Sequence, residues 1–235
     1  LLALFAWMFY RDNPEECGLE MDGPHSEEWR AKMAEKVPET RKEFTRLEAI
    51  KTFPFWVFNI GISTQSLIIT AYTFHVASIG SEWGLSRDVV YALFLPMPIF
   101  SVAANLLVGW ISDLVKLKWI LIAMLTVQAV GTLGILRLDE PVGRWMLIVG
   151  YGAAGGFFAI LTTVTWPRFY GREHLGGISG LNMAIMVFAS AIGPVVFSSI
   201  RGLTGSYAEI VLVSLLLPFV LLIFSPFAEN PQEKV

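Results

Sequence analysis

The chain has 235 residues, of which 54% are hydrophobic and only 16% are charged. Soluble domains carry about 25% charged residues, so this composition indicates a membrane protein. The net charge of −3 predicts no nucleic-acid partner, and the single cysteine, Cys17, excludes a disulfide within the chain.

The chain begins with an apolar stretch, residues 1–10, that does not start with methionine or with a charged leader segment. A helix needs about 20 residues to cross a bilayer, so we expect 1–10 to be the end of a truncated transmembrane helix. Residues 11–52 are rich in Glu, Lys and Arg and are predicted to be an inter-domain loop. Thr45 and Glu48 have the spacing of a capping box, which predicts a short amphipathic helix before the next span.

Six apolar runs of membrane-spanning length follow. We place them at 53–79, 89–112, 119–138, 144–167, 175–200 and 208–227, with a short tail at 229–235. The breaks between the runs are brief, so neighbouring helices must be antiparallel and pack into one bundle over 53–228. The predicted fold is an all-α polytopic membrane protein whose surroundings are a lipid bilayer.

The basic residues predict the orientation of this bundle. If the loops alternate across the membrane, the side opposite residues 11–52 holds only four of the 17 Lys and Arg residues, namely Arg87, Arg137, Arg144 and Arg201. Loops on the cytoplasmic side carry the excess of positive charge. Residues 11–52 and the C-terminus are therefore predicted to be cytoplasmic, in a plasma or inner membrane.

Polar residues within the spans predict the faces that look inward, because a polar side chain in hydrocarbon must face protein or a water-filled cavity. In the first span they recur every three or four residues, as along one face of a helix. The candidate substrate-cavity residues are Asn59, Ser63, Ser66, Thr70, Tyr91, Ser101, Asn105, Thr162 and Asn182. Helix packing is the alternative, and we prefer it for the glycines of 152–156. The third and sixth spans are more apolar, which predicts two three-helix repeats.

Ionisable groups are scarce inside the spans: no Asp, Glu, Lys or Arg lies in the middle of any of them. His75 lies near the outer end of the first span and is either a proton carrier or, the interpretation we prefer, a histidine bonded to a neighbouring helix. The chain contains no HExxH motif, no serine elbow and no cysteine–histidine cluster. We therefore expect no enzyme activity, no cofactor and no metal.

The polar break GWISDLVKLK at 109–118 separates the second span from the third. It resembles the G-x-x-x-D-R/K-x-G-R/K-R/K signature of the major facilitator superfamily, in the copy found in the C-terminal half, with Gly109, Asp113 and Lys118 matching. The segment WPRFYGREHLGGISG at 166–180 is similar to the bacterial monocarboxylate and oxalate/formate antiporter-like branch. The resemblance implies alternating access, a small-molecule substrate such as an organic acid, and a missing N-terminal six-helix bundle as the partner.

We predict a cytoplasmic gate at Gly109, Asp113, Lys118 and Arg172. In this prediction Asp113 meets the positive N-terminal end of the span that starts near Leu175, beside Arg172. The alternative is a turn in which Lys116 and Lys118 serve only as positive-inside anchors.

For the whole chain, the main hypothesis is secondary transport of a small organic anion. The alternatives are an exporter of amphiphilic or neutral solutes and a non-transporting sensor or assembly subunit.

Overall fold

The computed structural model describes residues 41–234. The predicted helix end at 1–10 and most of the predicted loop at 11–52 lie outside the described residues. Every regular element within the described residues 41–234 is helical. The elements are α3 (Arg46–Ala49), α4 (Phe53–Glu82), α5 (Arg87–Ala92), α6 (Met97–Ile111), α7 (Leu117–Gly134), α8 (Pro141–Tyr170), α9 (Leu175–Thr204) and α10 (Tyr207–Phe224), with the short 3₁₀ turns η2 (Ile135–Arg137), η3 (Ser225–Phe227) and η4 (Pro231–Lys234).

The six predicted spans all correspond to helices of this fold. Five stretches are long and apolar enough to cross a membrane, namely Arg87–Ile111, Leu117–Arg137, Pro141–Tyr170, Leu175–Thr204 and Tyr207–Lys234. The sixth predicted span is α4. Its 30 residues are enough to cross a membrane, but this helix is less apolar than the five stretches because of its polar stripe. The all-α polytopic fold is confirmed.

One local prediction is also confirmed. Thr45 accepts a hydrogen bond from the Glu48 amide, and Glu48 in turn accepts from the Thr45 amide, so the capping box starts the single turn α3. Hydrogen bonds from Lys42 and then from Thr45 lower the pKa of Glu48 to about 2. The second predicted span is interrupted between α5 and α6, next to Pro96, which has no amide hydrogen for a helical bond.

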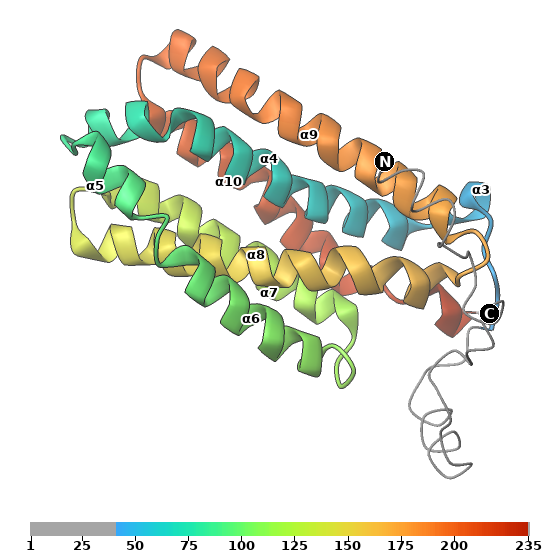
Figure 1. Cartoon of the computed structure of the whole chain (residues 1–235). Coiled ribbons are helices and arrows are strands. Elements are labelled where there is room, and N and C mark those ends of the chain that lie inside the picture. Colours follow the sequence, from blue (N-terminus) through green and yellow to red (C-terminus); the bar gives the residue numbers. More distant parts are fainter. Residues whose placement is uncertain (1–40, 235) are drawn as a thin grey trace, which may run out of the picture. The chain divides into compact units, whose positions relative to one another are not determined.

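The helices pack as one close pair and one group of three, which α10 joins (Figure 1). α4 lies along α9, and α8 lies between α6 and α7. A Cβ added at Gly156 of α8 would lie 2.4 Å from the Ser101 carbonyl oxygen of α6, and one at Gly193 of α9 would lie 2.4 Å from the Leu67 carbonyl oxygen of α4. These glycines therefore let the helix backbones touch, as predicted for the glycines of the α8 span.

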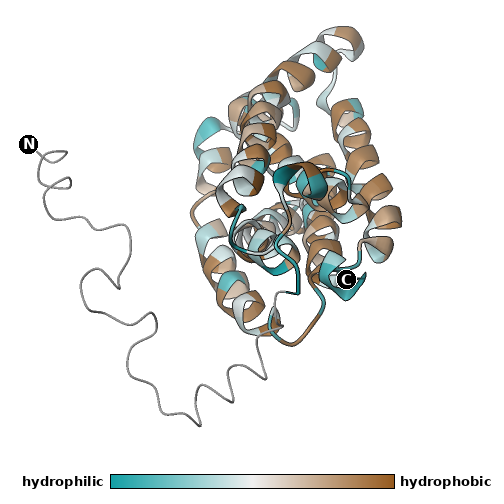
Figure 2. Cartoon of the chain, turned by 90° about the vertical axis from the view of Figure 1, so that its right-hand side faces the viewer, coloured by the Kyte–Doolittle hydropathy of each residue, from teal (hydrophilic) through white to brown (hydrophobic). Residues whose placement is uncertain are grey.

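Charged residues gather at one end of the bundle, which we call the basic end; it holds residues 41–52, 112–118, 168–175 and 225–234. The opposite end holds residues 80–88, 135–144 and 201–208. Figure 2 shows hydrophilic residues around α3 and the C-terminus at the basic end, in front of helices that are mostly hydrophobic. The predicted short tail is part of this end, because η4 is hydrogen-bonded to residues 41–42 and to α8.

Candidate functional site

The predicted cavity residues of α4 and α9 include two buried amides, on helices that pack against each other. Asn59 is fully buried and Asn182 nearly so. Neither oxygen nor nitrogen of the Asn59 amide has a hydrogen-bond partner among the described residues, and the Asn182 amide nitrogen also lacks one. Amides are costly to bury unpaired, so these two side chains hold hydrogen-bonding groups that the bundle itself does not use.

Further along α4 the polar residues are less deeply buried. Ser63 is 4% exposed and has no partner for its hydroxyl, whereas Ser66 and Thr70 are half-buried. The Thr70 hydroxyl lies 2.9 Å from the Ser190 hydroxyl of α9. The stripe predicted on α4 thus faces α9 at Thr70 and extends from the buried Asn59 towards the middle of the helix.

A second group of predicted cavity residues lies between α6 and α8. Ser101 and Asn105 are half-buried on α6, beside the α8 glycines. Thr162 of α8 donates its hydroxyl hydrogen to a carbonyl oxygen of its own helix, Phe158 or Ala159. Tyr91 lies apart from both groups, since it belongs to α5 near the opposite end and is 51% exposed.

Asp113 forms an ion pair with Arg168 in the last turn of α8. The predicted contact of Asp113 with the N-terminal end of α9, beside Arg172, is therefore wrong. Arg168 also donates to the carbonyl oxygen of Ser112, the C-cap residue of α6. A guanidinium at a helix C-terminus binds its unpaired carbonyls and favours the negative end of the helix dipole, which explains why Arg168 is the partner. Arg172 is exposed in the turn that follows.

The other two predicted gate residues have different surroundings. Gly109 faces α8, where an added Cβ would lie 3.5 Å from the Ile160 Cδ1 atom. Lys118 is 11% exposed, forms an ion pair with Glu229 and donates to the Pro226 carbonyl oxygen at 2.9 Å. Lys118 therefore binds the C-terminal segment and has no part in the Asp113 contact.

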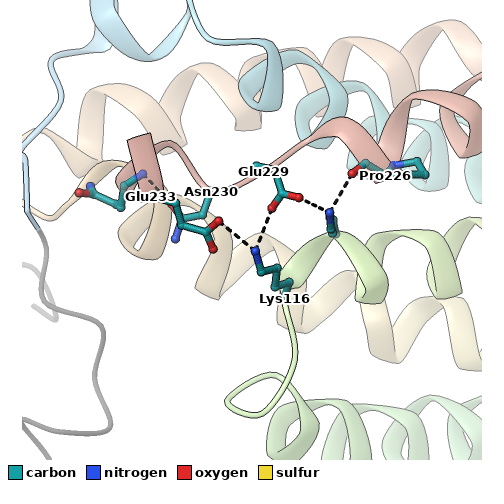
Figure 3. Close-up of polar contacts among 7 residues, drawn as sticks. Lys116, Pro226, Glu229, Asn230 and Glu233 are labelled. Atoms are coloured by element: carbon teal, nitrogen blue, oxygen red, sulfur yellow. Dashed lines mark hydrogen bonds and ion pairs between the residues drawn. The ribbon is translucent and has the colours of Figure 1, made fainter. Parts of the chain in front are cut away.

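A charged cluster joins the start of α7 to the C-terminal segment (Figure 3). Lys116 points toward two carboxylates and lies 2.9 Å from Glu233 and 3.2 Å from Glu229. The hydrogen bond to Glu233, followed by the one to Glu229, raises the pKa of Lys116. The cluster joins the C-terminal segment to the start of α7.

Gln232 ties the same segment to two further parts of the basic end. Its side-chain oxygen accepts from the amides of Arg41 and Lys42, at 3.1 and 3.0 Å. Its side-chain nitrogen donates to the carbonyl oxygens of Lys42 and Phe169, at 2.8 and 3.1 Å. One buried side chain therefore connects the segment that enters the bundle to the end of α8.

We expect Gln232→Ala to release residues 41–42, because four hydrogen bonds to backbone groups are lost together and unpaired buried groups cost about 1–3 kcal/mol. Limited trypsin digestion followed by mass spectrometry should show faster cleavage after Arg41 and Lys42. Gln232→Glu keeps the acceptor and loses the donor, so its cleavage rate should lie between those of Gln232→Ala and the original protein. Equal rates for all three proteins would contradict the role assigned to Gln232.

Sequence reasoning missed Arg168, Glu229 and Gln232 as parts of this end. The only available signal for Arg168 was its position in the last turn of a span, on the same side of the membrane as Asp113. Glu229 and Gln232 carry no signal, because a short polar segment after the last span is typical of a solvated tail.

Comparison with known proteins agrees with the arrangement of helices. Residues 1–194 match the family model described as Major Facilitator Superfamily. The chain is also similar to the aspyridones efflux protein apdF of Emericella nidulans, with 22% identity over 187 residues that cover 76% of this chain and 37% of that protein. The chain thus matches little more than a third of the length of this relative.

Proposed function

Because this chain belongs to the Major Facilitator Superfamily, we propose that it is one helical bundle of a secondary transporter that works by alternating access. In this proposal a second six-helix bundle faces α6 and α9, and the substrate lies between the two bundles. The exposed faces of these helices support it, since α9 buries only Ile178, Asn182, Gly193 and Phe197. We further propose that the basic end is cytoplasmic, in a plasma or inner membrane, as the positive-inside rule favours.

The polar groups available to a substrate carry the proposal. Along α4, α6, α8 and α9 they are hydroxyl and amide groups, and the Asp, Glu, Lys and Arg side chains of these helices lie within one turn of a helix end. A substrate on this side would be bound by neutral hydrogen-bonding groups such as Ser66, Ser101 and Asn105. The unpaired amide groups of Asn59 and the unpaired amide nitrogen of Asn182 are further hydrogen-bonding groups of this bundle.

For the cargo we propose a small organic anion such as a monocarboxylate, in line with the resemblance of segment 166–180 to that branch of the superfamily. A carboxylate needs a compensating positive charge in a low-dielectric site. On this proposal the charge comes from the second bundle, while the neutral groups of α4 and α6 orient the organic part of the molecule.

Export of an amphiphilic or uncharged solute is the second candidate. The absence of charge along the middle of α4 to α10 favours it, because such a surface accepts an uncharged molecule without a desolvated, unpaired ion. Similarity to a protein named as an aspyridones efflux protein points in the same direction.

Proteoliposomes that contain the full-length protein test the proposal. We expect saturable uptake of labelled monocarboxylates. Asn105→Leu should reduce this uptake about three- to tenfold, because it removes one hydrogen bond to the substrate, which contributes about 0.5–1.5 kcal/mol. The control is Thr126→Val on α7, where the hydroxyl bonds only to its own helix. Absence of uptake for every small organic acid, together with resistance of cells to amphiphiles, would favour the exporter. Unchanged function after replacement of both Asn59 and Asn105 would favour the sensor or assembly subunit.

A further inference from the structure

A groove at the basic end opens between the start of α4 and the C-terminal segment, residues 225–234. Its volume is about 300 Å³, which is within the range of small-molecule sites. The charged residues that line it are Glu229 and Lys234, and its apolar walls are formed by Phe44, Phe53, Pro54 and Pro231. None of the polar groups proposed to bind the cargo lines this groove, so it is a separate feature of the molecule.

Aromatic side chains show where this groove lies relative to the bilayer. Trp56 of α4, Trp119 of α7 and Phe224 of α10 each lie within one turn of a helix end at the basic end, and all three are exposed. Tryptophan rings gather where the hydrocarbon of a bilayer meets the headgroups. Phe53 is the first residue of α4, one turn before Trp56. The groove therefore lies at the level of the lipid headgroups.

One wall of the groove continues onto the surface that faces lipid. Phe53 is 46% exposed and packs edge-to-face on Phe224, with 6.2 Å between the ring centroids. From Leu212 to Phe224 every exposed residue of α10 is apolar. An apolar surface thus runs from the groove across Phe53 and along α10, in the direction that an acyl chain takes from a headgroup into the bilayer.

The charges of the groove favour an anionic ligand. The Glu229 carboxylate pairs with Lys116 and Lys118 of the charged cluster (Figure 3), so its negative charge is balanced from the α7 side. Lys234 is exposed and forms no ion pair within residues 41–234. The same holds for Lys51, which lies one residue before Thr52 in the lining of the groove. The groove therefore keeps a free positive charge.

A phospholipid uses both the charge and the apolar walls. A soluble anion would contact Lys234 but leave the surface of Phe53 and Phe224 uncovered, whereas an uncharged lipid would cover that surface and leave Lys234 without a counter-charge. Basic pockets beside membrane-spanning helices attract anionic headgroups because the headgroup and the lysine meet near the membrane surface. An anionic phospholipid is thus the ligand that fits this groove.

We propose that the groove binds one anionic phospholipid, whose phosphate contacts Lys234 and whose acyl chains lie along Phe53 and Phe224. The start of α4 and the C-terminal segment both line the groove. The bound lipid therefore joins these two parts of the basic end.

Native mass spectrometry of the full-length protein, with defined phospholipids added to the detergent solution, tests the proposal. Phosphatidylglycerol and phosphatidylcholine with identical acyl chains are compared, because they differ in net charge. We expect one phosphatidylglycerol molecule to bind about fivefold more tightly than phosphatidylcholine, the factor for one lysine near an anionic surface. Lys234→Gln should remove this preference, whereas Lys234→Arg keeps the charge and should keep the preference.

Two further variants separate the groove from a general attraction of lipid to the basic end. Arg172→Gln is the matched control, because Arg172 is an exposed cation at the same end that does not line the groove, and it should leave the preference unchanged. Phe53→Ala removes part of the apolar wall and should weaken the binding of phosphatidylglycerol about three- to tenfold.

Equal binding of the two phospholipids to the original protein would overturn the proposal. Equal losses in Lys234→Gln and Arg172→Gln would also overturn it, because they would show attraction to the whole basic end, and so would unchanged binding in Phe53→Ala. The measurement needs no substrate, so its outcome is independent of the proposed cargo.

Discussion

Replacement of Gly156 by valine is expected to destabilise the bundle by about 1–3 kcal/mol, as overpacking of a filled interior does. A Cβ at this position would lie 2.4 Å from the Ser101 carbonyl oxygen and 2.6 Å from the Asn105 amide nitrogen. Both atoms belong to the backbone of α6 and cannot rotate away. The variant must therefore push α6 from α8, which also displaces the Ser101 and Asn105 side chains from their place beside α8.

Thermal unfolding of the purified protein in detergent, followed by tryptophan fluorescence, measures this effect. Gly180→Val is the matched control, because Gly180 also lies inside a long helix but an added Cβ meets no atom within 4 Å. Both substitutions change helix propensity alike, so only the contact with α6 differs. Equal unfolding temperatures for the two variants would show that the α6–α8 contact has more room than the structure implies.

Much of the helical architecture could be predicted because it depends on local chemistry. An apolar run must form a helix in a bilayer to satisfy its own backbone, so the six helices follow from the sequence with small errors at their ends. Thr45 with Glu48 marks the start of α3. The glycines of α8 could be assigned to packing because their spacing puts them on one helix face.

The partners of individual residues could not be predicted, since they depend on which helices meet. Periodicity put Asn59 and Thr70 on one face of α4, but only the fold reveals that α9 covers Thr70 and that the Asn59 amide is left without a partner. Lys118 matches a signature position, yet its charge is paired with Glu229 because the C-terminal segment folds back onto α7. A hydrogen-bonded segment and a solvated tail have the same composition, so sequence reasoning could not tell them apart.

The same limit explains the error at Asp113. The N-terminal end of α9 was the predicted partner, but the Arg168 side chain also lies at the basic end. A helix end contributes about half an elementary charge, whereas a guanidinium carries a full charge and several donors in one plane. Arg168 satisfies Asp113 and the Ser112 carbonyl oxygen together. Arg168 carries a full charge and reaches two acceptors, so it is the stronger partner of Asp113.

Arg168→Gln is therefore expected to slow transport about tenfold, equivalent to ~1.4 kcal/mol, with little change in the amount of folded protein. Arg168 is 30% and Asp113 71% exposed, and an exposed ion pair alone contributes at most about 1 kcal/mol. The remainder comes from the bond to the Ser112 carbonyl oxygen, which fixes the end of α6 to the last turn of α8. If this end of the bundle closes in one transport state, loss of both contacts depopulates that state.

Initial uptake rates in proteoliposomes, for a substrate identified by the uptake screen, provide the measurement. Arg137→Gln is the matched control, because it removes the same charge from an exposed Arg137–Glu140 pair at the opposite end, where the charged atoms are 3.9 Å apart. Arg168→Lys keeps the charge but not the planar group that reaches two acceptors, so its rate should be intermediate. If Arg168→Gln and Arg137→Gln transport at the same rate, the Asp113–Arg168 contact anchors a turn and does not act as a gate.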